Sequence, residues 1–283
     1  MNTFLKIKSP LVSVNWLFAH KDAPNLIILD ATIEKVTRTF SKTKPEKEQL
    51  LGAIFFDLKN IFSDQNAPYP NTMLSLEKFE KEVSKIGVQK DSVIVVYDDI
   101  GMYSSARVWW LFKSMGFTNI AVLDGGFPAW KNATYPLGNS KKTKHNKGNF
   151  KATYTNGMIC NTEAVLIAIY DVNTHIIDAR SEGRFFGLVP EPREGLRGGH
   201  IPNSKNLPYA ELFEDGLLKS KEKLEFLFHT LNPKKDNMIF TCGSGITACI
   251  LALGAEIAGY VNTTVYDGSW TEWGSRLELP IEK

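Results

Sequence analysis

A single cysteine stands where a short apolar run gives way to a helical pattern, in the stretch 238-MIFTCGSGITACILALGAEIAG-259. The residues that follow Cys242 before this helix are Gly243, Ser244, Gly245, Ile246 and Thr247. Glycines let the backbone curl, so that successive N–H groups can point at one spot near the positive end of the helix dipole. A thiol held there is favoured as the thiolate, which is the nucleophilic form. The loop therefore predicts nucleophilic chemistry at Cys242, and the Ser244 and Thr247 hydroxyls can add hydrogen bonds.

The chain has three cysteines, and the other two lack such a loop. Cys249 lies on the apolar helix and is interpreted as a small buried hydrophobe, while Cys160 has no surrounding pattern and is interpreted as structural. Three scattered cysteines without a CxxC motif predict neither a disulfide framework nor a metal site. No metal or organic cofactor is expected, and a reducing cytoplasm is the expected location.

The elements that must position Cys242 occur twice in the sequence. Each half has a strand ending in Asp, then a strand–loop–helix unit, then a strand ending in Asp-Gly with an aromatic residue after it. The matching segments are 26–33 and 176–182, 93–117 and 238–260, and 120–130 and 264–273. Three elements in the same order at nearly equal intervals indicate two similar domains. We predict an N-terminal domain over 1–135, a polar and basic linker over 136–152, and a C-terminal domain over 153–283.

Within each half, short Val/Ile-rich runs alternate with helical patterns such as 105–116 and 222–231. This alternation predicts an α/β fold in which a mainly parallel sheet is flanked by helices. The two halves differ at the loop, because Asp98 stands in the first half where Cys242 stands in the second. The first loop, DDIGMYSS, lacks the Gly-Ser-Gly sequence and is expected not to curl in the same way. The first domain is therefore predicted to be catalytically inactive.

Composition excludes several classes of protein. Hydrophobic residues make up 43% and charged residues 23% of the 283 residues, values typical of soluble globular proteins. The 33 Lys and Arg residues nearly balance the 31 Asp and Glu residues, so neither a nucleic-acid surface nor a membrane surface is expected. The basic run 141-KKTKHNKGNFK-151 is interpreted as a solvated linker, and no apolar run approaches the length of a membrane helix.

The CGSGIT loop resembles the active-site loop of the rhodanese/sulfurtransferase superfamily, and of its 3-mercaptopyruvate sulfurtransferases in particular. The resemblance covers nearly the whole chain and implies two tandem rhodanese-like domains with an inactive first copy. It implies a persulfide on Cys242, carried from a small-molecule sulfur donor to a thiol such as thioredoxin, or to cyanide, with release of pyruvate. Thiosulfate sulfurtransferases usually have basic residues after the cysteine, so Gly243 and Ser244 favour mercaptopyruvate as the donor.

Two arginines, Arg184 and Arg193, enclose a Pro-Glu-Pro turn just past a strand end. A guanidinium group suits a carboxylate, because two parallel hydrogen bonds fix its orientation. On spacing alone, structural ion pairs with Glu182 or Glu194 are as good an interpretation. The segment resembles the family motif R-F-x-G-x-x-P-E-P-R, which implies that both arginines bind substrate. Arg180, Arg197 and the segment 199-GHIPN-203 are interpreted as structural.

The segment 55-FFDLKNIFSDQNAPYPNTML-74 resembles the family segment that faces the cysteine loop. Relatives often have a histidine just before the Met-Leu pair, in a proposed relay with an aspartate and the loop serine. Asn71 and Thr72 stand there in this chain, and Asp57 and Asp64 are the nearby acids. These four residues are the candidate first-domain contributors to the site.

Three other functions remain open on the sequence. Thiosulfate:cyanide sulfurtransferase belongs to the same superfamily. A cysteine phosphatase would need an arginine about six residues after the cysteine to clamp phosphate, and position 248 is Ala. A non-catalytic binding module is the third alternative, although the intact Cys242 loop argues against it.

Overall fold

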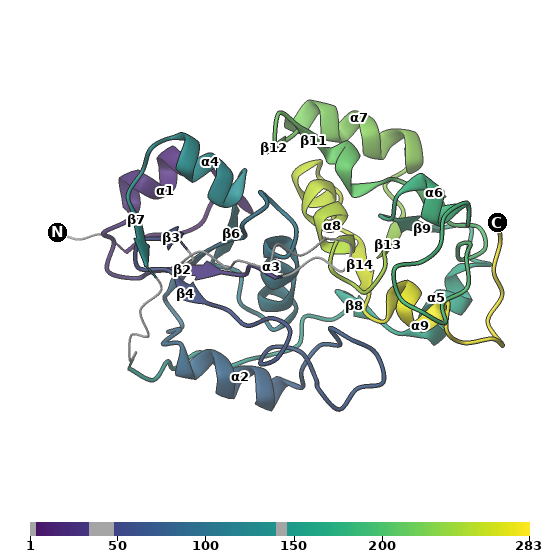
Figure 1. Cartoon of the computed structure of the whole chain (residues 1–283), viewed down its shortest axis with the longest axis horizontal. Coiled ribbons are helices and arrows are strands. Elements are labelled where there is room, and N and C mark those ends of the chain that lie inside the picture. Colours follow the sequence, from purple (N-terminus) through teal and green to yellow (C-terminus); the bar gives the residue numbers. More distant parts are fainter. Residues whose placement is uncertain (1–3, 34–47, 140–145) are drawn as a thin grey trace. The chain divides into compact units, whose positions relative to one another are not determined.

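The computed structural model describes residues 4–33, 48–139 and 146–283 (Figure 1). The chain divides into two compact units. The first contains Met1–Ser63 and Leu74–Thr155, and the second contains Asn156–Lys283 together with Asp64–Met73. Residues 140–145 of the predicted linker lie outside the described residues. Within the described ranges, no helix has the length and apolar character needed to cross a bilayer.

The first unit is built on a parallel sheet with the strand order β1-β6-β5-β2-β4. Its strands are β1 (Leu11–Val12), β2 (Leu26–Asp30), β4 (Ile54–Phe55), β5 (Val93–Tyr97) and β6 (Ile120–Leu123). Its helices are α1 (Val14–His20), α2 (Leu76–Lys85), α3 (Ser105–Ser114) and α4 (Gly126–Asn132). An antiparallel pair, β3 (Glu48–Leu50) and β7 (Leu137–Asn139), completes this unit.

Helices cover both faces of this sheet. Figure 1 shows α1 and α4 on one side of the strands and α2 and α3 on the other. Leu17 of α1 and Trp130 of α4 belong to a buried cluster with Ile28 and Val95 of the central strands. Because β5 is buried on both faces, all five of its residues are apolar or aromatic.

The second unit repeats the arrangement with the strand order β10-β9-β13-β14-β8, again with every pair parallel. Its strands are β8 (Ile159–Cys160), β9 (Thr174–Asp178), β10 (Lys205–Asn206), β13 (Asn237–Thr241) and β14 (Thr263–Tyr266). Its helices are α5 (Thr162–Ala168), α6 (Glu182–Phe185), a 3₁₀ turn (Tyr209–Leu212), α7 (Lys221–Leu231), α8 (Ala248–Ile257) and α9 (Ser269–Trp273). A short hairpin, β11 (Phe213–Glu214) and β12 (Leu217–Leu218), precedes α7.

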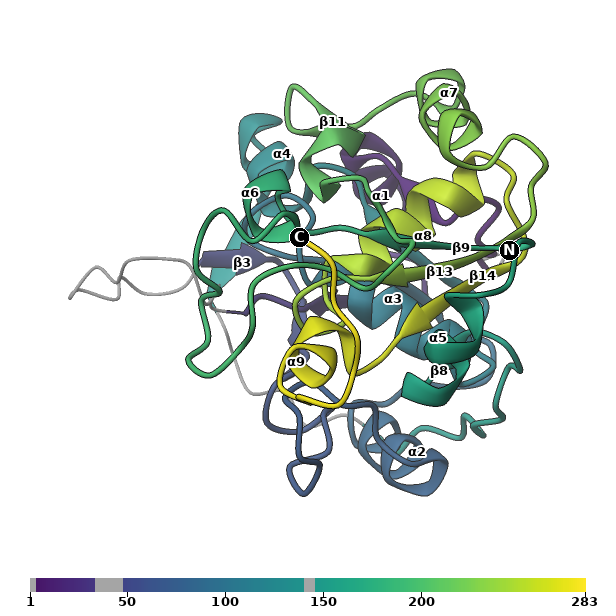
Figure 2. The same ribbon diagram turned by 90° about the vertical axis from the view of Figure 1, so that its right-hand side faces the viewer.

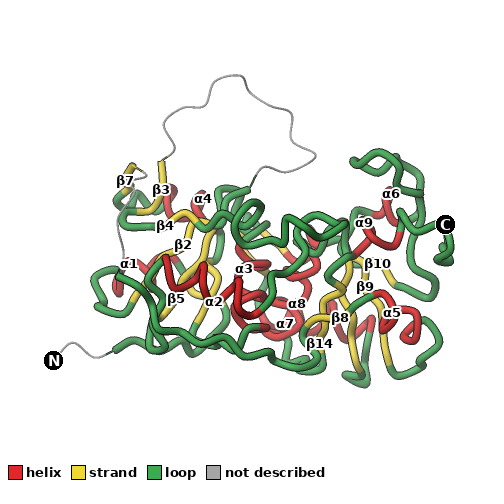
Figure 3. The backbone as a smooth tube through the Cα atoms, turned by 90° about the horizontal axis from the view of Figure 1, so that it is seen from below, coloured by secondary structure: helices red, strands yellow, loops and turns green. Residues whose placement is uncertain are grey.

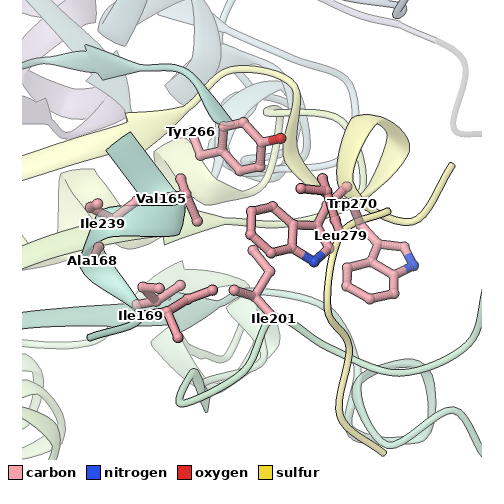
Figure 4. Packing of buried hydrophobic residues seen from close by; sticks show 10 residues of the cluster. Val165, Ala168, Ile169, Ile201, Ile239, Tyr266, Trp270 and Leu279 are labelled. Carbon is pink, nitrogen blue, oxygen red and sulfur yellow. The ribbon is translucent and has the colours of Figure 1, made fainter. Parts of the chain in front are cut away.

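Figure 2 shows α7 and α8 on one side of β9, β13 and β14, with α5 and α9 on the other. The core under α5 and α9 is shown in Figure 4, where Trp270 lies among aliphatic side chains. Val165 of α5, Ile239 of β13 and Tyr266 of β14 belong to the same cluster. The short helix α9 is therefore anchored by tryptophan burial, which fixes the chain just beyond β14.

Two long connections contain neither helix nor strand, one between β4 and α2 and the other between α6 and β10 (Figure 3). They carry the candidate first-domain residues and Arg193, respectively. The described part of the predicted linker makes hydrogen bonds to the first unit: Gly148 N–H donates to Ser84 O and Phe150 N–H donates to Val88 O.

The predicted fold class is confirmed: each unit has a parallel sheet flanked by helices. The helical pattern over 105–116 forms α3, and the pattern over 222–231 forms α7. The apolar run before Cys242 forms β13, and the helix begins at Ala248 as expected.

Candidate active site

Cys242 is the first residue after β13 and lies at the carboxyl edge of the sheet in the second unit. The loop then reaches α8 through Gly245, whose φ of 74° lies in the left-handed region that glycine adopts without strain. None of the backbone hydrogen bonds among the described residues uses the N–H groups of Ile246, Thr247 or Ala248 as donors. These three amides at the start of α8 are thus available to an anion held by the loop.

The loop is held in place by a serine beyond β14. Ser269 Oγ accepts the N–H of Cys242 at 3.2 Å and the N–H of Gly245 at 3.1 Å, and it donates to Tyr266 O at 2.8 Å. Trp270 N–H donates to Cys242 O at 2.9 Å. Sequence reasoning missed Ser269, although the Asp-Gly-aromatic ending shared by both halves was a signal that this turn matters.

Arg193 joins this turn to the loop. Its Nη1 donates to Thr271 Oγ1 at 3.3 Å and its Nη2 donates to Ser244 Oγ at 3.4 Å. Thr271 in turn donates to Gly243 O from its hydroxyl, at 2.5 Å, and from its backbone N–H, at 2.8 Å. The structure therefore brings Arg193 and Ser244 together, and it adds Thr271, which sequence reasoning also missed.

Arg184 also lies close to the loop, and its guanidinium group forms an ion pair with Glu191. Its Nε and Nη2 donate to Glu191 at 3.2 and 2.5 Å, so the ion pair is with the acid of the Pro-Glu-Pro turn rather than with Glu182 or Glu194. A Cβ built on Gly243 would lie 3.1 Å from Arg184 Nη2. Gly243 thus lets the guanidinium group approach the backbone of the loop.

Glu191 is itself part of a buried chain of charges. Arg180 Nη1 donates to Glu191 Oε1 at 2.9 Å, and its Nε and Nη2 donate to Asp178. Burial alone would lower the pKa of the Arg180 guanidinium, but Asp178 and Glu191 outweigh it and the pKa lies above its ordinary value. Arg180 is structural as expected, and it fixes the carboxylate that orients Arg184.

The other residues interpreted as structural also make structural contacts. Arg197 donates to the backbone carbonyl groups of Trp273, Gly274, Arg276 and Leu279. The His200 ring is buried, stacks on Phe185 and contacts Phe185 O through Nδ1 at 3.0 Å. Both side chains tie loops together.

Among the candidate first-domain contributors, Asn71 reaches the loop. Its Nδ2 donates to Ser244 Oγ at 3.0 Å and contacts Ser244 O at 3.4 Å. The next residues are fixed as well, because Met73 N–H donates to Asp267 Oδ2 at 2.9 Å. Asp267 is the Asp of the repeated Asp-Gly pair and directly follows β14, but it was not among the predicted site residues.

Thr72, Asp64 and Asp57 make hydrogen bonds with neighbouring residues of the connection between β4 and α2. Thr72 donates from its hydroxyl to Tyr69 O and accepts the N–H of Asp64 at its carbonyl oxygen. Asp57 belongs to the first unit and accepts hydrogen bonds from the N–H and side-chain amide of Asn60. These contacts shape the connection between β4 and α2.

The three cysteines have different surroundings. Burial, reinforced by the negative charge of Asp267, raises the pKa of the Cys160 thiol to about 12. The Cys249 thiol donates to Gly245 O at 3.3 Å from within α8. Cys242 alone stands at the start of the glycine-rich loop that leads to the three available amides.

The model of the rhodanese-like domain matches residues 13–133 and again residues 162–276. The chain belongs to the rhodanese-like family. Its tandem organisation is confirmed, since the two matched segments cover most of the sequence.

Relatives within the rhodanese-like family align over nearly their full length. The chain is 33% identical to the 3-mercaptopyruvate sulfurtransferase of Escherichia coli (strain K12), over 96% of this chain and 97% of the relative. It is 37% identical to the 3-mercaptopyruvate sulfurtransferase of Mus musculus (95% and 93%) and 35% identical to the thiosulfate sulfurtransferase of Rattus norvegicus (94% and 92%). The crystal structure of SseA from E. coli superposes with a TM-score of 0.82 at 29% identity, covering 93% of this chain and 99% of SseA.

Proposed function

We propose that this chain is a 3-mercaptopyruvate sulfurtransferase that carries sulfur as a persulfide on Cys242. The observation that carries the proposal is the loop itself. A buried cysteine begins a loop that ends in three amide groups without a backbone hydrogen bond. Arg193 contacts this loop at Ser244, and Arg184 lies close to Gly243. The names of the full-length relatives support the same function.

The reaction has two half-reactions. In the first, the Cys242 thiolate attacks the sulfur of 3-mercaptopyruvate and forms an S–S bond while the C–S bond breaks. The electron pair of the C–S bond leaves with pyruvate as its enolate, which takes one proton. In the second, an acceptor thiolate attacks the outer sulfur of the persulfide and regenerates the Cys242 thiolate.

The loop amides support the charged states of the sulfur. The N–H groups of Ile246, Thr247 and Ala248 lie at the N-terminus of α8, where backbone dipoles favour an anion. We assign to them the stabilisation of the thiolate and of the ionised persulfide. Ser269 supports this arrangement because its hydroxyl oxygen accepts the N–H groups of Cys242 and Gly245. The loop is thereby held in its curled conformation by a side chain from outside it.

The arginines favour mercaptopyruvate over thiosulfate. Relatives named for either donor are 33–37% identical to this chain, so sequence identity does not choose between the two donors. The loop has Gly243 and Ser244 where a basic pair would attract doubly charged thiosulfate. The cations stand outside the loop, Arg184 on α6 and Arg193 on the connection that follows it. Guanidinium groups outside the loop suit the carboxylate at the far end of a three-carbon donor.

The acceptor is a thiol, and thioredoxin is one that fits, because a persulfide is resolved by attack of a thiolate. All three cysteines are free, which agrees with a compartment that keeps thiols reduced, such as the cytoplasm. The domain boundaries at 135 and 153 stay a prediction.

Initial rates with 3-mercaptopyruvate and with thiosulfate, measured side by side with cyanide as acceptor, test this function. We expect kcat/KM to be higher with mercaptopyruvate, with one pyruvate released per sulfur transferred. Replacing Gly243→Arg together with Ser244→Lys is expected to shift the preference toward thiosulfate. A higher kcat/KM of the unmodified enzyme with thiosulfate would replace the proposed function by that of a thiosulfate sulfurtransferase.

A further inference from the structure

The side-chain amide of Asn71 meets the cysteine loop at Ser244. It lies on the segment Asp64–Met73, which is part of the second unit, and the contact of Met73 N–H with Asp267 fixes the end of that segment. Asn71 has a φ of 65°, a left-handed conformation that Asn adopts more readily than most residues. The backbone at this position is thus suited to a short amide side chain.

The surroundings fix which way the amide points. Asn71 Nδ2 is 3.0 Å from Ser244 Oγ and 3.4 Å from Ser244 O. A backbone carbonyl oxygen can only accept hydrogen bonds, so the group that faces it is the NH₂ and not the oxygen of the amide. Asn71 is therefore a donor to the Ser244 hydroxyl.

A second donor reaches the same hydroxyl oxygen. Arg193 Nη2 lies 3.4 Å from Ser244 Oγ, and a guanidinium group can only donate. The two lone pairs of Ser244 Oγ are thereby directed at Asn71 and Arg193. Its single hydrogen is directed elsewhere, because the Ser244 hydroxyl is the acceptor in both of these hydrogen bonds between described residues.

We propose that Asn71 is a positioning residue that fixes Ser244 as a hydrogen-bond donor to the substrate. The inference rests on the proposed function. The Ser244 hydrogen bond is made to the carbonyl oxygen of 3-mercaptopyruvate, which becomes the enolate oxygen as the C–S bond breaks. Ser244 keeps its proton throughout, and the enolate takes its proton from solvent to give pyruvate. A donor aimed at a developing oxyanion stabilises the transition state more than the ground state.

This assignment differs from a histidine relay in its pH dependence. Neither an amide, a guanidinium group nor a serine hydroxyl changes its charge between pH 6 and 8. The Asn71–Ser244–Arg193 contact therefore adds no ionisation to the pH profile of kcat in that range. Replacing Asn71→His introduces a group that does titrate there.

The decisive comparison is between Asn71→Ala and the isosteric Asn71→Asp. The alanine variant loses one hydrogen bond, and we expect kcat for pyruvate release to fall roughly three- to tenfold with little change in KM. The aspartate variant keeps the shape but replaces the donor by an acceptor, which draws the Ser244 hydrogen away from the substrate. We expect its kcat to lie roughly tenfold below that of the alanine variant. An Asn71→Asp enzyme as active as Asn71→Ala would overturn the proposal.

Three controls separate positioning from other effects. Asn66→Ala changes an exposed amide in the same segment and is expected to leave kcat unchanged. Ser244→Ala is expected to lower kcat roughly a hundredfold, and adding Asn71→Asp to it should lower kcat no further. A further fall in that double variant would show that the carboxylate acts without Ser244 and would sink the proposal. Equal thermal midpoints for Asn71→Asp and Asn71→Ala exclude a folding defect as the cause.

The pH profile gives an independent readout. We expect kcat of the unmodified enzyme to show no inflection between pH 6 and 7, and that of Asn71→His to gain one. An inflection already present in the unmodified enzyme and unchanged in Asn71→Ala would also contradict the inference. Failure of the proposed function looks different, because the unmodified enzyme would then release no pyruvate and form no persulfide on Cys242.

Discussion

The chain has two strand–loop–helix units, and their loops differ in the residue that stands at the strand end, which is Asp98 in the first unit and Cys242 in the second. In the first unit, Asp98 Oδ2 accepts the N–H groups of Tyr103, Ser104 and Ser105 at 2.6, 3.0 and 2.9 Å, together with the Ser105 hydroxyl. In the second unit, Cys242 stands at the same strand end, and the amides at the start of the helix make no backbone hydrogen bond. The backbone N–H groups of the first loop are thus hydrogen-bonded to the carboxylate of Asp98. Those at the start of the second helix can instead donate to a bound anion.

The turn after the third strand makes this difference possible. Phe127 N–H donates to Asp98 O at 3.0 Å just as Trp270 N–H donates to Cys242 O at 2.9 Å. Before each aromatic residue the backbone is left-handed, with a φ of 52° at Gly126 and 49° at Ser269. A Cβ on Gly126 would lie 2.6 Å from Asp98 O, so that copy needs glycine. The second copy has room for a serine, whose hydroxyl holds the loop from outside.

The comparison corrects one expectation. The sequence DDIGMYSS was expected not to curl, because it lacks the Gly-Ser-Gly sequence of the second loop. The structure shows three successive amides converging on Asp98, with Gly101 in a left-handed conformation at a φ of 107°. The first copy lacks a thiol, and its donors are already satisfied.

The largest effect is expected from exchanging the occupant of the second loop. Cys242→Ser removes the nucleophile and is expected to lower kcat by roughly a thousandfold or more. Cys242→Asp should be as inactive, but its carboxylate can collect the loop amides as Asp98 does, and we expect its free energy of unfolding to match or exceed that of Cys242→Ser. Chemical denaturation checks the second part.

The matched control for both variants is Cys249→Ser, which keeps a donor to Gly245 O. It should retain activity and should still gain one sulfur atom on the peptide that contains Cys242 when treated with 3-mercaptopyruvate. Persulfide found only at Cys160 or Cys249 by peptide mass spectrometry would contradict the assignment of the nucleophile.

The converse change in the first loop should damage stability without creating activity. Asp98→Cys removes a carboxyl group that accepts five hydrogen bonds in a fully buried position, and we expect the free energy of unfolding to fall by about 2–3 kcal/mol. Asp98→Asn keeps one acceptor oxygen and should lose less. Pyruvate release by Asp98→Cys combined with Cys242→Ser would contradict this expectation and would show that a thiol in place of Asp98 is enough to make the first copy active.

Arg184 and Arg193 distinguish the two loops further, because both lie at the loop that follows Cys242. Removing one charge-assisted contact costs about 1.5–3 kcal/mol, so we expect kcat/KM for mercaptopyruvate to fall roughly ten- to a hundredfold in Arg193→Ala or Arg184→Ala. The decrease in kcat/KM should be smaller for Arg184→Ala, because two nitrogen atoms of the Arg184 guanidinium group already donate to Glu191. Gly243→Ala, which places a methyl group against Arg184, should resemble the weaker variant.

Steady-state kinetics with both donors measure these effects. Arg276→Ala is a matched control, because its guanidinium group forms ion pairs with Glu272 and Glu278. An Arg184→Ala enzyme impaired more than Arg193→Ala would indicate that the pair with Glu191 opens when the substrate binds.

The fold could be predicted from the sequence because each helix and strand of the repeat has its own local pattern of apolar residues. Alternating apolar runs and helical patterns locate β13, α8 and their counterparts, and the repeat confirms the assignment by occurring twice. Cys242 could be predicted in the same way. It is followed by Gly243 and Gly245, and a junction between a strand and a helix needs such glycines only where the backbone must curl.

The rest of the site depends on contacts between segments distant in sequence. Ser269 contacts Gly245 from beyond β14, and Asn71 contacts Ser244 from a connection in the first half of the chain. A serine in a short motif or an asparagine in a loop has no local pattern that distinguishes a contact with the site from solvent exposure. The ion-pair partner of Arg184 could not be predicted from sequence either, because Glu182, Glu191 and Glu194 all lie close to it along the chain and only the folded loop selects Glu191.

The smallest effect on activity is expected at Cys160, which serves as the contrast to Cys242. Burial raises the pKa of its thiol from 9.0 to about 12, so the folded protein keeps Cys160 protonated where an unfolded chain would ionise it. Its contribution to stability is fully present below pH 9 and is lost as the pH rises toward 12. Cys160→Ala should therefore leave kcat near its normal value and weaken the decline of unfolding free energy over that interval. Alkylation by iodoacetamide at pH 8 should modify Cys242 well before Cys160, and the reverse order would contradict the assigned environments.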